Sequence, residues 1–215
     1  MTPYYQSDRA LVFCADCRDV VKHWTQPVAA IVVDPPHFGR DYVSDLTDGV
    51  RSWQAKEMGE WMTARLGFFH SWIPACHQMV GEGPMWVHLQ LHQVFPFQST
   101  AYWDRWMAQQ AWQLSSEEAL VCLCQSGRIS PTAITHVRAH AELNKFNAPK
   151  PVEWIKVLLG LSPDGPVLDP MMGTGSTLLA ALALGRQAIG IEIREELCQQ
   201  AVARIEAFQH DPVPA

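Results

Sequence analysis

Two kinds of apolar pattern alternate along the first part of the chain. Leu11 to Cys14 and Val28 to Val33 are continuous apolar runs, and the second is rich in β-branched residues. Such runs are typical of strands that are buried on both faces of a parallel sheet. Arg18 to Trp24, which lies between them, predicts a short crossover helix. We therefore expect an α/β fold with a doubly wound, mostly parallel sheet.

The same alternation returns after residue 150. Pro151 stands where a helix can begin, and the residues after it carry apolar side chains at helical spacing. The predicted elements are a helix from Val152 to Leu161, a strand at Val167 and Leu168, a helix from Ser176 to Leu184, a strand from Ala188 to Ile193 and a helix from Glu195 to Phe208. Residues 210–215 are expected to form a flexible tail.

The middle of the chain has a weaker pattern. Large apolar residues follow a helical spacing from Ser52 to Met79, and Pro74 is expected to break this helix. Pro84 to Leu91 and Glu118 to Gln125 predict strands, and Thr100 to Gln110 predicts a helix. We expect this region to complete the sheet.

The composition is that of one globular domain over residues 1–215. Apolar residues make up 48% of the chain and charged residues 18%, which excludes a disordered protein. No apolar run approaches the roughly 20 residues that span a bilayer, and the N-terminus carries no signal pattern, so we expect a cytoplasmic protein without membrane contact. The net charge of -6 argues against a broad polyanion-binding surface but allows a local basic cleft.

The six cysteines are expected to be buried thiols rather than disulfides or metal ligands. Cys14 and Cys17 have the spacing of a zinc or redox pair, but no second pair with that spacing follows. We therefore predict no metal site.

A glycine-rich loop near the C-terminus suits a cofactor that contains a nucleoside. Val167 to Thr177 reads as a strand, a turn with Gly173 and Gly175, and a helix start, so that the backbone can approach a ligand closely. Glu192 ends the next strand about 20 residues later, where a carboxylate would bind ribose hydroxyls. The loop lacks the Gly-Lys-Ser/Thr of a P-loop and the three glycines of a dinucleotide site.

A second loop follows the strand at Val28 to Val33 and reads Asp34-Pro35-Pro36-His37. Ligands of open α/β sheets lie beyond the carboxyl ends of the strands. Asp16, Asp34, Asp169 and Glu192 should therefore converge on one rim of the sheet. The alternative for each carboxylate is that it caps the N-terminus of a nearby helix.

These motifs resemble those of the S-adenosylmethionine-dependent DNA amino-methyltransferases, the N6-adenine and N4-cytosine family. Asp34 to His37 is similar to the catalytic D-P-P-Y except at its last position. Leu168 to Thr177 resembles the cofactor loop L-D-P-F-M-G-S-G-T-T, with methionine at position 171 where phenylalanine is usual. Lys150 to Glu153 resembles K-P-V-E, and Ala15 to Cys17 fits the place of G-D-C.

The resemblance implies a Rossmann-like class I methyltransferase fold in circularly permuted order, with the catalytic motif before the cofactor motif. It implies S-adenosyl-L-methionine as the cofactor and DNA as the partner, either duplex with a flipped base or single-stranded. Insertions that face the target base are then expected within residues 43–147. Because this region leaves little chain for a recognition domain, a homodimer or a partner subunit could supply sequence specificity.

The resemblance also implies roles for particular residues. The catalytic residues would be Asp34, Pro35, Pro36 and His37, in which the Asp34 carboxylate and the Pro35 carbonyl accept the two hydrogens of the target amine. The cofactor-binding residues would be Asp16, Asp34, Lys150, Pro151, Asp169, Pro170, Met171, Gly173, Gly175, Ser176 and Glu192. Within this set, Asp16 would contact the adenine edge and Glu192 the ribose. The methionine portion would be held by Asp169, Gly173 and Gly175, and Lys150 and Pro151 would complete the pocket.

His37 departs from the family pattern. Imidazole covers less of a base than phenol does, and it can gain a proton near neutral pH. We expect an active enzyme whose rate falls when His37 is protonated. Adenine N6 is the expected acceptor, with cytosine N4 as the alternative. A weak or inactive subunit that acts with a partner is a further alternative, and RNA is a less favoured acceptor.

Overall fold

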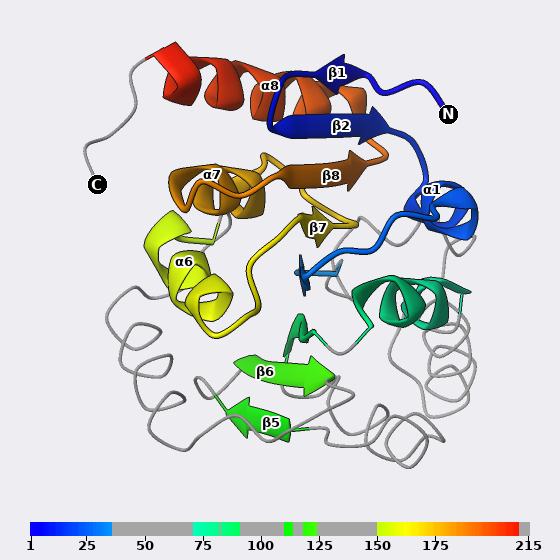
Figure 1. The fold of residues 1–215 in the computed structure, drawn as a ribbon, viewed down its shortest axis with the longest axis vertical. Helices are drawn as coiled ribbons and strands as arrows, with labels where there is room; N and C mark the ends of the chain where they lie inside the picture. Colours follow the sequence, from blue (N-terminus) through cyan, green and yellow to red (C-terminus); the bar gives the residue numbers. More distant parts are fainter. Residues whose placement is uncertain (36–70, 82, 91–109, 114–117, 124–149, 211–215) are drawn as a thin grey trace, which may run out of the picture.

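The structure is a computed structural model that describes residues 1–35, 71–81, 83–90, 110–113, 118–123 and 150–210 (Figure 1). Its described strands form one eight-stranded sheet in the order β1-β2-β8-β7-β3-β4-β6-β5. They are β1 (Tyr5–Gln6), β2 (Ala10–Cys14), β3 (Ala30–Val33), β4 (Met85–Gln90), β5 (Gln110–Gln113), β6 (Glu118–Leu123), β7 (Val167–Asp169) and β8 (Ala188–Glu192).

The sheet is mostly parallel. Strands β2, β8, β7, β3 and β4, in this order, pair in parallel with one another. β1 is antiparallel to β2 at one edge, and β6 is antiparallel to both β4 and β5 at the other. The predicted doubly wound, mostly parallel sheet is confirmed.

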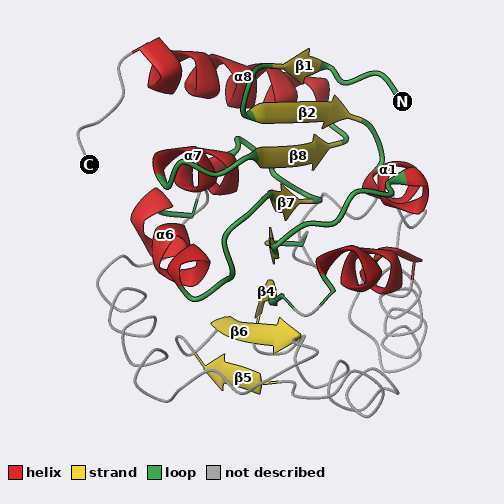
Figure 2. Cartoon of the chain, in the orientation of Figure 1, coloured by secondary structure: helices red, strands yellow, loops and turns green. Residues whose placement is uncertain are grey.

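Helices cover both faces of this sheet (Figure 2). The described helices are α1 (Cys17–His23), a helix at residues 71–80, α6 (Val152–Gly160), α7 (Ser176–Ala183) and α8 (Glu195–His210). Helices α6, α7 and α8 bury their apolar residues in one core cluster, whereas α1 and the helix at residues 71–80 contribute to a second. None of the described helices combines the length and the apolar character needed to cross a membrane.

Strand β3 shows why the central strands are continuous apolar runs. Ala30 and Val32 belong to the core under α6, α7 and α8, and Ile31 and Val33 belong to the core under α1. All four residues are buried. A strand with a core on each face leaves no position for a polar side chain, which accounts for the pattern.

The sheet changes winding direction between β7 and β3, which are neighbours. From β7 the chain passes through α7 to β8 on one side, while β4 lies beyond β3 on the other side. In open α/β sheets, the crevice at the carboxyl ends of two such strands is where ligands bind.

Three predicted elements differ from the structure. The helix at residues 71–80 continues through Pro74. Pro74 is the fourth residue of the described helix, where its missing N–H removes no hydrogen bond between described residues. The neighbouring Trp72 and Ile73 are fully buried. Gln110, predicted to end a helix, instead begins β5 and pairs with Cys122. His210, predicted to lie in the tail, is the last residue of α8.

The remaining differences concern short elements and regions that are not described. Strands β1 and β5 were not predicted. The predicted helix at residues 100–109 and the loops within residues 43–147 lie outside the described residues. The five described cysteines are free thiols, and all of them except the half-buried Cys14 are buried.

Candidate functional site

Four acidic residues follow one another along one edge of the sheet. Asp16, Glu192, Asp169 and Asp34 stand at or just beyond the carboxyl ends of β2, β8, β7 and β3, which are adjacent in this order. The strand register pairs Cys14 with Glu192. The structure therefore gathers on one rim the four carboxylates that come from both ends of the sequence.

The loop after β7 contains two glycines with different surroundings. Gly173 and Gly175 have φ angles of 53° and 81°, a conformation that side chains disfavour. A Cβ added to Gly173 would meet no described atom within 4 Å, so this residue borders open space. A Cβ on Gly175 would lie 3.1 Å from the Ala201 Cβ, because the loop packs closely against α8. Gly173 thus permits the approach of a ligand, and Gly175 permits the approach of a helix.

Glu192 holds the glycine loop against the end of β8. Its Oε2 accepts a hydrogen bond from the Gly173 N–H at 3.1 Å, and its Oε1 accepts one from the Arg194 N–H at 2.9 Å. Burial raises the pKa of the Glu192 carboxyl, although these backbone donors favour its charged form. Each carboxylate oxygen retains lone pairs that could accept a ligand hydroxyl.

Asp169 is the most buried of the four carboxylates, with 4% of its surface exposed. Its Oδ1 accepts a hydrogen bond from the Met171 N–H at 3.0 Å, and the Thr177 side chain also bonds to the carboxyl group. Burial raises the pKa of Asp169 to about 7, and the charges of Asp34 and Glu192 act in the same direction. Asp169 therefore changes its charge near neutral pH.

Asp16 caps the N-terminus of α1. Its Oδ1 accepts the Arg18 N–H at 2.9 Å, and the Arg18 guanidinium also bonds to the carboxylate. The Arg18 hydrogen bonds hold the pKa of Asp16 below its usual value. The helix-capping alternative is therefore realised at Asp16, which keeps its place on the rim.

Asp34 forms an ion pair with Lys150. The Lys150 Nζ lies 3.5 Å from the Asp34 Oδ2, and the side chains are 9% and 32% exposed, respectively. Pro35 is buried, and Pro151 is the N-cap residue of α6. Pro36 and His37 lie outside the described residues.

The start of α7 adds two hydroxyl groups close to the loop. The Thr177 side chain bonds to Asp169, whereas the buried Ser176 Oγ has no hydrogen-bond partner among the described residues. A buried hydroxyl without a partner is uncommon, and a bound polar ligand could satisfy it. Together with the open space at Gly173 and the carboxylates on the rim, this arrangement fits a nucleoside-containing cofactor.

Sequence reasoning missed three residues near the site. Arg18 neutralises Asp16, and the Arg204 Nη1 donates to the carbonyl and the hydroxyl of Thr174 at 2.6 and 2.9 Å. Ile193 directly follows Glu192 and is 53% exposed, which is unusual for a large apolar residue. An apolar residue immediately after a carboxylate at a strand end was a signal for Ile193, whereas only the three-dimensional structure identifies the contact of Arg204.

Comparison with known proteins identifies relatives of this arrangement. The family model for N6/N4 DNA methylases matches residues 88–203, which is more than half of the chain. At the sequence level, the chain is 49% identical over 53 residues to the type II methyltransferase M.ScaI of Streptomyces caespitosus. The matched stretch covers 24% of this chain and 17% of the relative. The matched stretches span between 17% and 27% of the lengths of the relatives found in this way.

Solved structures resemble the whole fold. TTHA0409, a proposed DNA modification methylase from Thermus thermophilus solved with S-adenosyl-L-methionine, superposes with a TM-score of 0.65 at 17% identity, and the match covers 95% of this chain and 96% of that protein. The PvuII DNA methyltransferase, described as cytosine-N4-specific, superposes with a TM-score of 0.66 at 12% identity over 99% and 90% of the two chains. At these identities the similarity shows a shared class I methyltransferase fold.

Proposed function

Because the chain belongs to the N6/N4 family of DNA methylases, we propose that it transfers a methyl group from S-adenosyl-L-methionine to the exocyclic amine of a base in DNA, with adenine N6 as the acceptor. One observation carries this proposal. Asp34 opens the proposed catalytic motif, and Asp169 opens the proposed cofactor loop. They stand at the carboxyl ends of β3 and β7, which are direct neighbours at the switch point of the sheet.

The residues around the glycine loop would hold the cofactor. Gly173 leaves open space for it, Glu192 would bind the ribose hydroxyls, and Asp16 would contact the adenine edge. The exposed Ile193 side chain would lie against the adenine ring. The bound cofactor supplies a methyl group activated by a sulfonium centre.

Further positions follow from the family motifs. The methionine portion would lie along Asp169, Gly173 and Gly175, with Pro170 and Met171 in the same loop. The buried Ser176 hydroxyl, which has no partner among the described residues, would find one in the bound state. Arg204 would keep the loop in shape through its two hydrogen bonds to Thr174.

Asp34 and Pro35 would prepare the acceptor amine. The lone pair of an exocyclic amine is delocalised into the ring, so the amine is a weak nucleophile. An Asp34 carboxylate that accepts one amine hydrogen and a Pro35 carbonyl that accepts the other would favour a more tetrahedral nitrogen. Pro35 and Pro36 restrict φ, so these acceptors need little reorganisation. The carboxylate can also receive the proton that the methylated amine must lose.

Two alternatives remain for the acceptor and the partner. Cytosine N4 is the other amine that this family methylates, and the PvuII enzyme with the similar fold is described as specific for it. A homodimer or a partner subunit would supply sequence specificity, and in that arrangement this chain could be the weaker or inactive subunit. RNA is a less favoured acceptor.

The decisive experiment uses methyl-labelled S-adenosyl-L-methionine with duplex DNA, single-stranded DNA and RNA in separate reactions. Digestion and chromatography then identify the methylated nucleoside. We expect N6-methyladenine from DNA with the wild-type protein, and a rate at least about 100-fold lower with Asp34→Asn. Asp8→Asn, in the exposed turn between β1 and β2, is the matched control and should act like the wild type. Detection of N4-methylcytosine would show that cytosine N4, and not adenine N6, is the acceptor. Cofactor binding without any methyl transfer would favour the partner-subunit alternative.

The role of His37 is proposed from the sequence motif alone, and it can be tested separately. If its imidazole stacks on the target base, protonation of His37 should lower the transfer rate at acidic pH. His37→Tyr should then remove this loss of activity. Equal pH profiles for the two proteins, with equal rates, would contradict the proposed role of His37.

A further inference from the structure

We propose that Lys150 is a positioning residue for Asp34, and that its ammonium group keeps the Asp34 carboxylate charged and aimed at the rim of the sheet. This inference rests on the proposed function. It differs from the role that the sequence motif implies, in which Lys150 completes the cofactor pocket. The geometry points instead to the acceptor side of the site.

The ion pair accounts for the unusual burial of Lys150. Its side chain is 9% exposed, and lysine is rarely buried to this extent unless its charge is paired. The Nζ–Oδ2 distance of 3.5 Å places the ammonium beside the Asp34 carboxylate. Asp34 itself is 32% exposed, so its carboxylate is still accessible from the rim.

Both partners stand on rigid supports. Lys150 directly precedes Pro151, the N-cap residue of α6, whose ring restricts φ and whose observed φ is -62°. α6 is anchored through buried residues that include Trp154 and Leu158. Asp34 directly follows β3, whose four residues are all buried. The pair therefore connects the start of α6 to the end of the catalytic strand in a fixed geometry.

The charges around Asp34 show why a cation is needed there. Asp169 at the end of β7 interacts with Asp34 electrostatically, and Glu192 at the end of β8 adds to the negative charge at this rim. Lys150, Asp169 and Glu192 are charged groups that the structure describes at this end of the sheet, together with Asp16 at the end of β2. Carboxylates that are close together disfavour each other's ionisation, and Lys150 counteracts this effect at the residue that must accept an amine hydrogen.

The alternative is that Lys150 only ties the segment before α6 to the sheet. Such a role would change stability without changing the charge of Asp34. The two roles can be separated with Lys150→Met, which removes the ammonium, and Lys150→Arg, which restores a cation. Lys156→Met is the matched control, because Lys156 is on α6 and pairs with Glu153 on the surface.

The first measurement is the titration of the Asp34 carboxyl by ¹³C NMR, with Asp34→Asn used to assign the signal. We expect Lys150→Met to raise its midpoint by about one pH unit, since removal of a neighbouring opposite charge favours the neutral carboxyl. Lys150→Arg should return it close to the wild-type midpoint, and Lys156→Met should not move it. An unchanged midpoint in folded Lys150→Met would overturn the proposal.

The second measurement separates acceptor positioning from cofactor binding. At saturating S-adenosyl-L-methionine, the transfer rate of Lys150→Met should fall to half of its plateau about one pH unit higher than that of the wild type, and the two rates should converge at higher pH. Its dissociation constant for the cofactor, measured by calorimetry, should stay within about threefold of wild type. A tenfold weaker affinity with an unchanged saturated rate would instead assign Lys150 to the cofactor pocket and overturn the proposal.

Two controls keep these outcomes distinct. If Lys150→Met does not fold, Lys150→Gln removes the charge but keeps a polar head group, and the same measurements apply to it. A wild-type protein that binds cofactor but transfers no methyl group would count against the proposed function. The NMR titration would still decide whether Lys150 sets the charge of Asp34.

Discussion

Asp169 makes the stability of the protein depend on pH at the scale of one residue. Burial raises its pKa to about 7, whereas an aspartate in an unfolded chain titrates near about 3.9. Between these values the native state binds more protons than the unfolded state, so the free energy of unfolding decreases as the pH rises. We predict that Asp169→Asn, which cannot ionise, is more stable than wild type by about 1–3 kcal/mol at pH 8.

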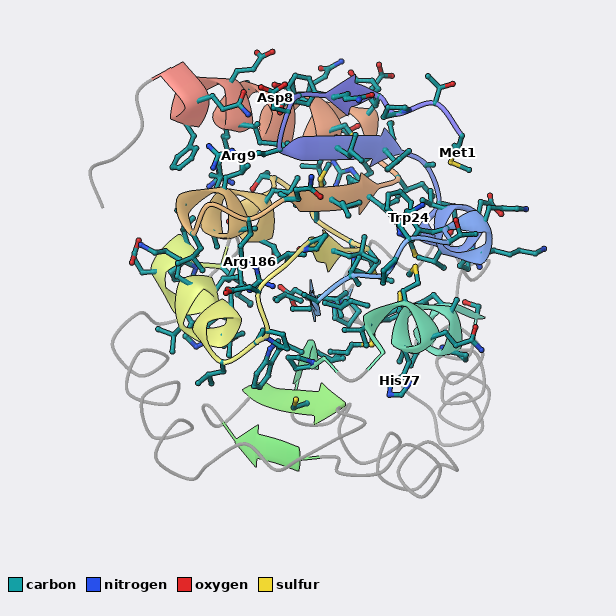
Figure 3. The ribbon with its side chains drawn as sticks, viewed as in Figure 1. Met1, Asp8, Arg9, Trp24, His77 and Arg186 are labelled. Carbon is teal, nitrogen blue, oxygen red and sulfur yellow. The ribbon has the colours of Figure 1, made fainter. Side chains whose placement is uncertain are left out.

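Urea unfolding of both proteins at pH 5 and pH 8 checks this prediction. The difference between them should shrink strongly at pH 5, because the wild-type carboxyl is then largely protonated in the native state. The exposed Asp8→Asn provides the control (Figure 3). A stability difference that is the same at both pH values would contradict the assigned role of burial.

Gly190 is required for close packing between β8 and the cofactor loop. A Cβ at this position would lie 2.3 Å from the Met172 Sδ and 2.8 Å from a Leu178 methyl carbon. We predict that Gly190→Ala destabilises the protein by about 1–3 kcal/mol, since an overpacked core must shift to make room. Gly160→Ala is the control: its Cβ would meet no described atom within 4 Å, and alanine favours a helix. Thermal or urea unfolding distinguishes them, and equal stabilities would contradict the prediction.

At the scale of elements, Arg186 fixes the end of α6 against the sheet. The guanidinium is 8% exposed and donates to the carbonyls of Gly165, Leu159 and Pro163 at 2.8, 3.1 and 2.8 Å (Figure 3). The carbonyls at the end of a helix carry partial negative charge and lack partners within the helix. Arg186 thus supplies hydrogen-bond donors to three backbone carbonyls at the end of α6 and in the segment that leads from α6 into β7.

We predict that Arg186→Met destabilises the protein by about 2–4 kcal/mol, because it leaves buried carbonyls without donors. Arg186→Lys should recover part of the loss, since lysine keeps the charge but not the planar fork. Lys156→Met removes only a surface ion pair and should cost less than about 1 kcal/mol. Urea unfolding at neutral pH gives all three values, and a loss in Arg186→Met no larger than in Lys156→Met would contradict the prediction.

The elements that sequence predicted best are those whose burial is uniform. β3 and β8 lie between two helical layers, so every position is apolar or small up to the final carboxylate. β1 has only two residues and β5 contains two glutamines, so neither carries a periodic signal. Their pairing with β2 and β6 decides their conformation.

Some features of the candidate site could likewise be predicted from the sequence, and others could not. Asp34, Asp169 and Glu192 each lie at the end of a strand that the neighbouring residues predict. Since ligands bind at the carboxyl ends of parallel strands, the sequence alone could place these residues on one rim. Side-chain contacts between distant segments follow no such rule. The Lys150–Asp34 ion pair and the hydrogen bonds from Arg204 to Thr174 depend on how α6 and α8 pack against the sheet. No pattern in the sequence predicts this packing.

For the whole molecule, the two ends of the chain together build the cofactor side of the sheet. β2 from the N-terminal end pairs with β8 from the C-terminal end, and α8 lies alongside β1 and β2 (Figure 1). The Gln209 Nε2 donates to the Ser7 Oγ at 3.0 Å, so the end of α8 lies beside the β1–β2 turn. The loops that connect the elements set the order of the motifs along the chain. The site itself depends on how β2, β8 and α8 pack together.

We predict that a circular permutant preserves the fold and the cofactor site. Residue 215 would be joined to residue 1 by about ten Gly and Ser residues, and the chain would be opened between Gln26 and Pro27, which are exposed between α1 and β3. The permutant should bind S-adenosyl-L-methionine within roughly threefold of the wild-type affinity and unfold cooperatively. A matched permutant opened between Ala180 and Ala181, which are fully buried in α7, should not fold. If the first permutant also failed to fold, the connection between α1 and β3 would be part of what specifies the structure, and the position of β2 and Asp16 in the chain order could not be separated from the site.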